Sequence, residues 1–102
     1  MTNNDPDKNP QHPTPPLKVI YSGRVQGVGF RWTCEKISRG HNVAGTVRNL
    51  PDGTVELYAD GDSSDVNAFL AEIESEMSAN IRDTSISPVP DAVSFAGFRI
   101  VR

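Results

Sequence analysis

Apolar residues recur at regular spacing along residues 17–102, and the first such segments predict a strand followed by a helix. The segment 17–24 is rich in apolar residues and has Gly23 near its end, as expected for a strand. Over residues 30–40 the apolar positions recur at helical spacing, at Phe30, Cys34 and Ile37. We therefore expect a helix that ends at Gly40, because glycine is common after the last turn of a helix.

The next segments predict a hairpin and a second helix. Residues 43–50 form one strand, the turn signal Pro51-Asp52-Gly53 follows, and residues 54–60 alternate between apolar and polar positions. Asp62, Ser63 or Ser64 can cap the helix that comes next. Its apolar stripe follows the pattern i, i+3, i+4, i+7 and i+11, at Val66, Phe69, Leu70, Ile73 and Met77.

Two short strands complete the pattern. Residues 81–88 alternate weakly and predict an edge strand that Pro88 and Pro90 end, and residues 95–102 predict the last strand. The order β-α-β-β-α-β is typical of the ferredoxin-like fold. We therefore expect an α+β two-layer sandwich, with an antiparallel sheet, two helices on one face and a short C-terminal edge strand.

The length of 102 residues suits one domain. Residues 1–16 hold five of the eight prolines and no large apolar residue after Met1, so they cannot bury enough surface to offset the entropy of ordering. We expect 1–16 to be a disordered Pro-rich N-terminal tail and 17–102 to be the folded domain. A Pro-rich docking peptide is the alternative interpretation of the tail.

The composition excludes several classes of partner. The net charge is −3 and no basic run occurs, which argues against nucleic acid as a partner. No apolar run reaches the length of a membrane span. The single cysteine, Cys34, allows no intrachain disulfide, and no cluster has the spacing of metal ligands. We expect a cytoplasmic monomer with no metal and no cofactor, in which Cys34 is a core residue.

The segment 22–31, Ser-Gly-Arg-Val-Gln-Gly-Val-Gly-Phe-Arg, is the best candidate for a functional site. Its three glycines lie between a strand and a helix, where successive backbone N–H groups can form a concave anion site. The N-terminus of the helix favours negative charge, and Arg31 adds a planar guanidinium that matches two phosphate oxygens. A tight strand-to-helix connection without a ligand is the alternative.

Two known phosphate motifs do not fit this segment. A Walker A loop needs a lysine followed by Ser or Thr, and no lysine occurs between Lys18 and Lys36. A dinucleotide-binding fingerprint needs a third glycine after Gly27-Val28-Gly29, and position 32 is Trp. The segment is therefore a phosphate-site candidate of another kind.

Two segments together resemble the signatures of the acylphosphatase family. Gly23-Arg24-Val25-Gln26-Gly27-Val28-Gly29-Phe30-Arg31 resembles the first signature, and residues 45–55, Gly-Thr-Val-Arg-Asn-Leu-Pro-Asp-Gly-Thr-Val, resemble the second. The resemblance covers essentially all of 17–102, and the family's ferredoxin-like fold is the one that the pattern predicts. Thr46, where many members have an aromatic residue, and the link 40–43 depart from the family pattern.

The resemblance implies a set of site residues. The family's catalytic arginine falls on Arg31 and its catalytic asparagine on Asn49. The phosphate-binding backbone N–H groups fall on Arg24, Val25, Gln26, Gly27, Val28, Gly29 and Phe30. The implied reaction is the hydrolysis of a small acyl phosphate to a carboxylate and inorganic phosphate by in-line attack of water.

These residue types suit that reaction. A carboxylate is a weak base and leaves with little protonation, so the main task is to hold the phosphoryl group and align a water. Asn49 can accept a hydrogen bond from that water, whose proton can pass to a phosphoryl oxygen. Glu35 is the alternative base. A phosphate-binding module of the same fold without catalysis is the alternative function. An RNA-binding sheet is disfavoured because the net charge is acidic and the chain has only two tyrosines to stack on bases.

Overall fold

The computed structural model describes residues 15–89 and 94–102, which contain two helices and five strands. In chain order these elements are β1 (Leu17–Gly23), α1 (Phe30–Ser38), β2 (Ala44–Asn49), β3 (Val55–Asp60), α2 (Ser63–Glu76), β4 (Ile81–Pro88) and β5 (Phe98–Ile100). Every predicted element is present, and the order is the expected one. Most of the tail predicted for 1–16 lies outside the described residues. Pro16, at its end, is buried, and its carbonyl accepts the Val89 N–H at 2.8 Å.

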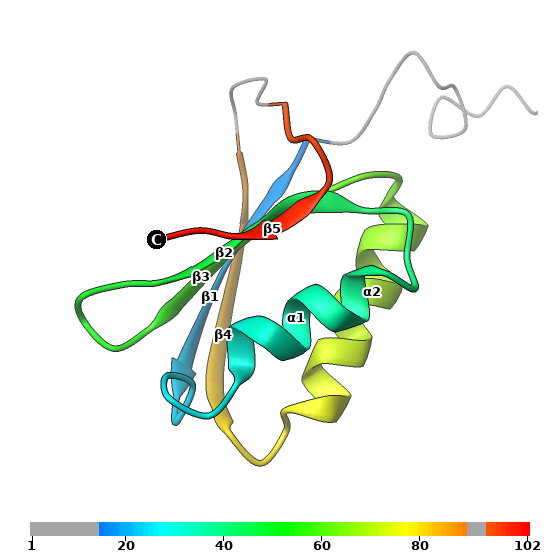
Figure 1. The fold of residues 1–102 in the computed structure, drawn as a ribbon. Coiled ribbons are helices and arrows are strands. Elements are labelled where there is room, and N and C mark those ends of the chain that lie inside the picture. Colours follow the sequence, from blue (N-terminus) through cyan, green and yellow to red (C-terminus); the bar gives the residue numbers. More distant parts are fainter. Residues whose placement is uncertain (1–14, 90–93) are drawn as a thin grey trace, which may run out of the picture.

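The five strands form one sheet in the order β4-β1-β3-β2-β5, and both helices cover the same face of it (Figure 1). The pairs β1–β3, β1–β4 and β2–β3 are antiparallel, as expected. The pair β2–β5 is parallel, so the expected short C-terminal edge strand makes the otherwise antiparallel sheet mixed. β5 runs in the direction opposite to β4, but it lies at the other edge of the sheet. Its neighbour there is β2, which runs in the same direction as β5, so the two strands pair in parallel.

The core lies between the helices and the sheet. Residues at alternate positions of β1 and β3 face the helices in register, since Val19 pairs with Leu57 and both are fully buried. The apolar stripe predicted for the second helix supplies the facing layer, and all five of its residues are buried. The two-layer sandwich thus follows from one apolar face on each layer.

Some element ends differ from the expected ones. The first helix ends at Ser38 with Arg39 as C-cap, two residues before Gly40, and α2 begins after Asp62, whose side chain makes no capping hydrogen bond. The final strand is shorter than predicted because only residues 98–100 pair with β2. Neither helix within the described ranges has the length and apolarity needed to cross a bilayer.

Gly45 allows β2 and β3 to approach closely, and its substitution tests the sheet. Its φ is +152°, and a Cβ at this position would overlap the Tyr58 carbonyl oxygen of β3. We expect Gly45→Ala to lower the free energy of unfolding by about 3 kcal/mol, since both strain and overlap add. Urea unfolding measures the change.

Gly53→Ala is the matched control for this prediction. Gly53 also has positive φ, +94°, but a Cβ there meets nothing within 4 Å. The expected cost is about 1 kcal/mol, from backbone strain alone. Equal losses for the two variants would contradict the close contact at Gly45.

Candidate active site

The loop that joins β1 to α1 carries the predicted phosphate segment. Gly27 and Gly29 have φ of +77° and +78°, in the left-handed region that favours glycine. A Cβ at either position would meet nothing within 4 Å, so the space above the backbone is open. Glycine is needed here for the backbone conformation, and the same feature lets a ligand approach the main chain.

The N–H groups of this loop are available to an anion. Within the described part of the chain, no hydrogen bond uses the backbone N–H groups of residues 25–29. The loop leads into the N-terminus of α1, where Gly29 is the N-cap, no side chain makes a capping bond and no acidic residue lies in the first turn. The positive end of the helix dipole is therefore not compensated by the protein itself.

Arg24 corrects one part of the predicted cradle. Its backbone N–H donates to the Asn80 carbonyl at 2.9 Å, in the turn between α2 and β4. This donor is not free for a phosphate, so the predicted cradle narrows to residues 25–30. The contact is close because Gly23, just before it, has no side chain: a Cβ there would lie 2.7 Å from the Arg82 nitrogen.

A cavity of about 190 Å³ brings the two predicted catalytic residues together. Arg31, from the first turn of α1, and Asn49, the last residue of β2, both line it. The remaining lining residues come from the loop, the start of α1 and β5: Val25, Gly27, Gly29, Phe30, Trp32 and Ile100. The helix and the central strands thus deliver the loop, a guanidinium and a carboxamide to one hollow.

The polar groups of Arg31 and Asn49 lack partners among the described residues. Among the described residues, the Arg31 guanidinium makes no ion pair or hydrogen bond, although it is half-buried. The Asn49 Oδ1 is buried and has no hydrogen-bond partner there either. A half-turn of the carboxamide exchanges its oxygen and nitrogen, so it can present an acceptor or a donor to the cavity. Unsatisfied buried groups of this kind are typical of functional sites.

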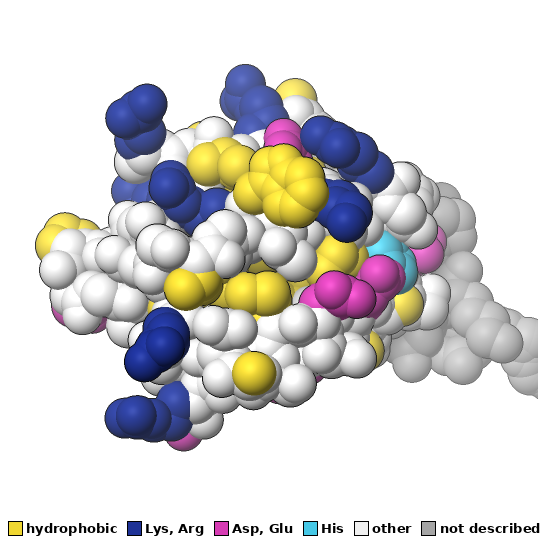
Figure 2. Space-filling view, turned by 60° about the horizontal axis from the view of Figure 1, so that its bottom comes forward, with side chains coloured by type: hydrophobic (Ala, Val, Ile, Leu, Met, Phe, Trp, Pro, Cys, Tyr) yellow, Lys and Arg dark blue, Asp and Glu magenta, His cyan; other side chains and the backbone are white. Residues whose placement is uncertain are grey.

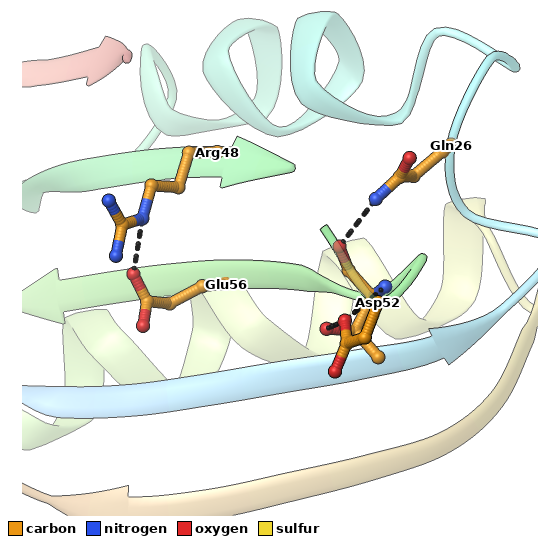
Figure 3. A network of polar contacts seen from close by, with 5 residues as sticks. Gln26, Arg48, Asp52 and Glu56 are labelled. Carbon is orange, nitrogen blue, oxygen red and sulfur yellow. Dashed lines mark hydrogen bonds and ion pairs between the residues drawn. The ribbon is translucent and has the colours of Figure 1, made fainter. Parts of the chain in front are cut away.

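Asn49 faces the helices because of the alternation along β2. Val47 is buried in the core, and Asn49, two residues on, lies on the same face. Arg48 points to the opposite face of the sheet, where its Nε donates to Glu56 Oε1 at 2.8 Å (Figure 3). Arg48 is therefore a paired charge that does not line the cavity.

The side chain of Gln26 has a role that the sequence did not indicate. Its Nε2 donates to the carbonyl oxygens of Leu50 at 2.9 Å and Thr54 at 2.8 Å, and Figure 3 shows it reaching from the loop toward the β2–β3 turn. These two bonds fix the predicted phosphate loop beside the strand end that carries Asn49. The sequence carries no signal for this contact, because the two acceptors lie 24 and 28 residues further along the chain.

The β2–β3 turn that receives Gln26 is itself held by Asp52. The Asp52 Oδ1 accepts the Thr54 hydroxyl at 2.6 Å and the Thr54 N–H at 3.0 Å. These hydrogen bonds from Thr54 lower the pKa of the Asp52 carboxyl, the side-chain bond contributing most. Asp52 is a turn residue, as its place in the sequence suggests.

Two other candidate groups lie outside the cavity. Glu35, the alternative base, has its carboxylate 3.6 Å from Arg39 Nη2 and does not line the cavity. Cys34 is fully buried, as predicted, and burial raises the pKa of its thiol from 9.0 to about 12. The described residues contain no cluster of His, Cys, Asp and Glu that could hold a metal ion.

The chain resembles known proteins both in sequence and in fold. The family model "Acylphosphatase" matches residues 17–100. An acylphosphatase of Clostridium acetobutylicum is 38% identical over 86 residues, which cover 83% of this chain and 92% of the relative. The crystal structure of acylphosphatase from Bacillus subtilis superposes with a TM-score of 0.75 at 28% identity, covering 85% of this chain and 98% of that one. HypF of T. kodakarensis, at 28% identity and a TM-score of 0.74, matches 83% of this chain but 11% of its own length.

These matches and the strand order define an α+β protein with the ferredoxin-like fold. The chain belongs to the acylphosphatase family. The predicted family and fold class are confirmed, and so is the expected class of enzyme, a hydrolase that acts on acyl phosphates.

Gln26→Ala tests the attachment of the loop to the hairpin. The substitution leaves two carbonyl oxygens without their donor and frees the loop. We expect the free energy of unfolding to fall by about 1–2 kcal/mol and the affinity for inorganic phosphate to fall with it. Urea unfolding and isothermal titration with phosphate measure the two effects. Thr84→Ala removes one exposed side-chain hydrogen bond, to Glu74, at the far edge of the sheet; phosphate affinity that falls equally in both variants would contradict the role of Gln26.

The Cys34 thiol makes stability depend on alkaline pH. Its pKa is higher in the folded state than the ordinary 9.0, so its contribution is complete below pH 9 and is lost as the pH rises toward 12. Between pH 8 and 10 we expect the wild type to lose about 1.4 kcal/mol more than Cys34→Ala, because the unfolded thiol ionises over this range. Urea unfolding at each pH measures the difference, and parallel curves for the two proteins would contradict it.

Proposed function

We propose that Arg31 and the backbone N–H groups of residues 25–30 bind the phosphoryl group of an acyl phosphate, while Asn49 aligns the attacking water. The observation that carries the proposal is a single cavity lined by an unpaired guanidinium, an unsatisfied carboxamide and open backbone amides. Each of these groups complements a dianionic phosphoryl group or a water beside it. Among the residues that the structure describes, no carboxylate lines the cavity to oppose an anion.

The proposed step is the displacement of a carboxylate at phosphorus. The water oxygen forms a bond to phosphorus as the bond from phosphorus to the acyl oxygen breaks, and the electron pair of that bond leaves on the carboxylate. One water proton moves to a phosphoryl oxygen, which gives a carboxylate and dihydrogen phosphate. Arg31 and the amides stabilise the charge on the equatorial oxygens as it redistributes.

The proton acceptor in this proposal is the substrate itself. The Glu35 carboxylate lies 3.6 Å from Arg39 Nη2 and does not line the cavity, so we do not assign it as the base for a water held by Asn49. The leaving carboxylate needs no acid because it is already a weak base. Binding and alignment therefore supply most of the rate enhancement.

Steady-state hydrolysis of benzoyl phosphate tests the residue assignments. We expect Asn49→Ala to lower kcat about 100- to 1000-fold, the effect of losing one preorganised polar group. Arg31→Ala should lower kcat/KM by more than about 1000-fold, since it removes binding and charge stabilisation together. Glu35→Gln is the matched control on the same helix, and we expect its rates to stay within twofold of wild type.

Three outcomes would contradict parts of this proposal. Equal rates for wild type, Arg31→Ala and Asn49→Ala would remove the catalytic assignment. Loss of turnover in Glu35→Gln with phosphate binding intact would make Glu35 the base. Tight phosphate binding without turnover in the wild type would favour the non-catalytic module.

The setting of the enzyme belongs to the same proposal. We propose that residues 17–102 act as one domain in the cytoplasm, as a monomer, on a small acyl phosphate with inorganic phosphate as product. The support is the single cysteine, the lack of a basic run and the family match from residue 17 to 100. Size-exclusion chromatography with light scattering tests the monomeric state.

A further inference from the structure

The active-site cavity has an apolar side that phosphate binding does not use. Trp32 and Ile100 both line it, and they are 57% and 37% exposed. They come from different elements, α1 and β5, so their meeting at one cavity is a product of the fold. Exposed apolar side chains scattered singly need no explanation, but a group of them at a cavity marks a binding surface.

Exposed large hydrophobic residues are concentrated at this end of the described structure. There are four of them, and the third, Val28, is 39% exposed and lies between the two lining glycines of the loop. The fourth, Ile86, is 54% exposed but belongs to β4, at the opposite edge of the sheet. Figure 2 shows apolar side chains gathered on the face that includes the lower end of Figure 1, with Lys and Arg side chains around them.

Trp32 is held in place on the helix. The Lys36 ammonium, one turn further along α1, lies 5.3 Å from the centroid of the indole ring, a cation–π contact. This contact restrains the ring without burying it, so the indole keeps a free apolar surface beside the cavity. A preorganised aromatic surface loses little entropy when a ligand packs on it.

We propose that Trp32 and Ile100 bind the acyl part of the substrate and select acyl phosphates with an extended apolar or aromatic acyl group. This inference rests on the proposed function, because the phosphoryl group must occupy the Arg31 side of the cavity. The ligand then has two chemically different ends, and the lining of the cavity offers both kinds of group: a guanidinium and amides for the phosphoryl end, and an indole and an isoleucine for the acyl end. Small or polar acyl groups leave the indole and the isoleucine in contact with water, so they gain no binding free energy from these side chains.

A series of straight-chain acyl phosphates tests the proposal. Acetyl, propionyl and butyryl phosphate have leaving carboxylates of nearly equal basicity, so their intrinsic reactivities are closely matched. We expect kcat/KM of the wild type to rise about threefold per added methylene, as each one leaves water. In Trp32→Ala the ratio of kcat/KM for butyryl over acetyl phosphate should fall from about tenfold to below threefold. Trp32→Phe, which keeps an apolar ring, should retain most of the ratio.

Ile86→Ala is the matched control, because it removes an equally exposed apolar residue far from the cavity and should leave the ratio unchanged. A flat chain-length series in a wild type that hydrolyses all three substrates would overturn the acyl-binding role and leave the proposed function intact. Failure of the wild type to hydrolyse any of them would overturn the proposed function instead. A ratio that survives in Trp32→Ala would also overturn the assignment of Trp32.

Discussion

A positive charge without a protein partner is the constraint on which the site depends. The Arg31 guanidinium is half-buried beside a helix N-terminus and a set of loop amides that are also unpaired within the described residues. Such an arrangement is costly in the empty protein, because each group has given up part of its hydration. It becomes favourable when an anion binds, and the stabilisation then grows with the charge that develops in a transition state.

The fold supports this costly arrangement from outside the cavity. The apolar faces of the sheet and the helices bury the core without any contribution from Arg31 or Asn49. Gln26, Asp52 and the Arg24 backbone then fix the loop and the neighbouring turn through hydrogen bonds within the protein. None of these hydrogen bonds uses the Arg31 guanidinium or the Asn49 carboxamide.

Much of the fold could be predicted from the sequence, because the spacing of apolar residues within a segment indicates whether that segment is a strand or a helix. The stripe of α2 is the clearest case, since all of its residues reach the core. The parallel pairing of β5 with β2 could not be predicted in the same way, because it depends on which edge of the sheet receives residues 98–100. Arg31 and Asn49 were predicted from a family resemblance. That both line one cavity depends on how β2 is placed relative to α1, which the sequence pattern does not give.

Two features of the site were beyond sequence analysis for the same reason. The Arg24 N–H belongs to the glycine-rich segment that was predicted to bind phosphate. Its acceptor is instead the Asn80 carbonyl, in a turn that is distant in the sequence. The side chain of Gln26 finds its acceptors across the β2–β3 hairpin. Both are long-range hydrogen bonds, and neither partner is marked by composition or periodicity.

The anchoring of the loop by Asn80 links the chemistry to the folding pathway. The acceptor belongs to the turn after α2, so the loop gains this hydrogen bond only once the helix and β4 have docked on the sheet. A partly synthesised or partly folded chain therefore lacks a finished anion site, whatever local structure it already has. Conversely, a phosphate that binds only the finished loop would shift the equilibrium toward the folded chain by mass action.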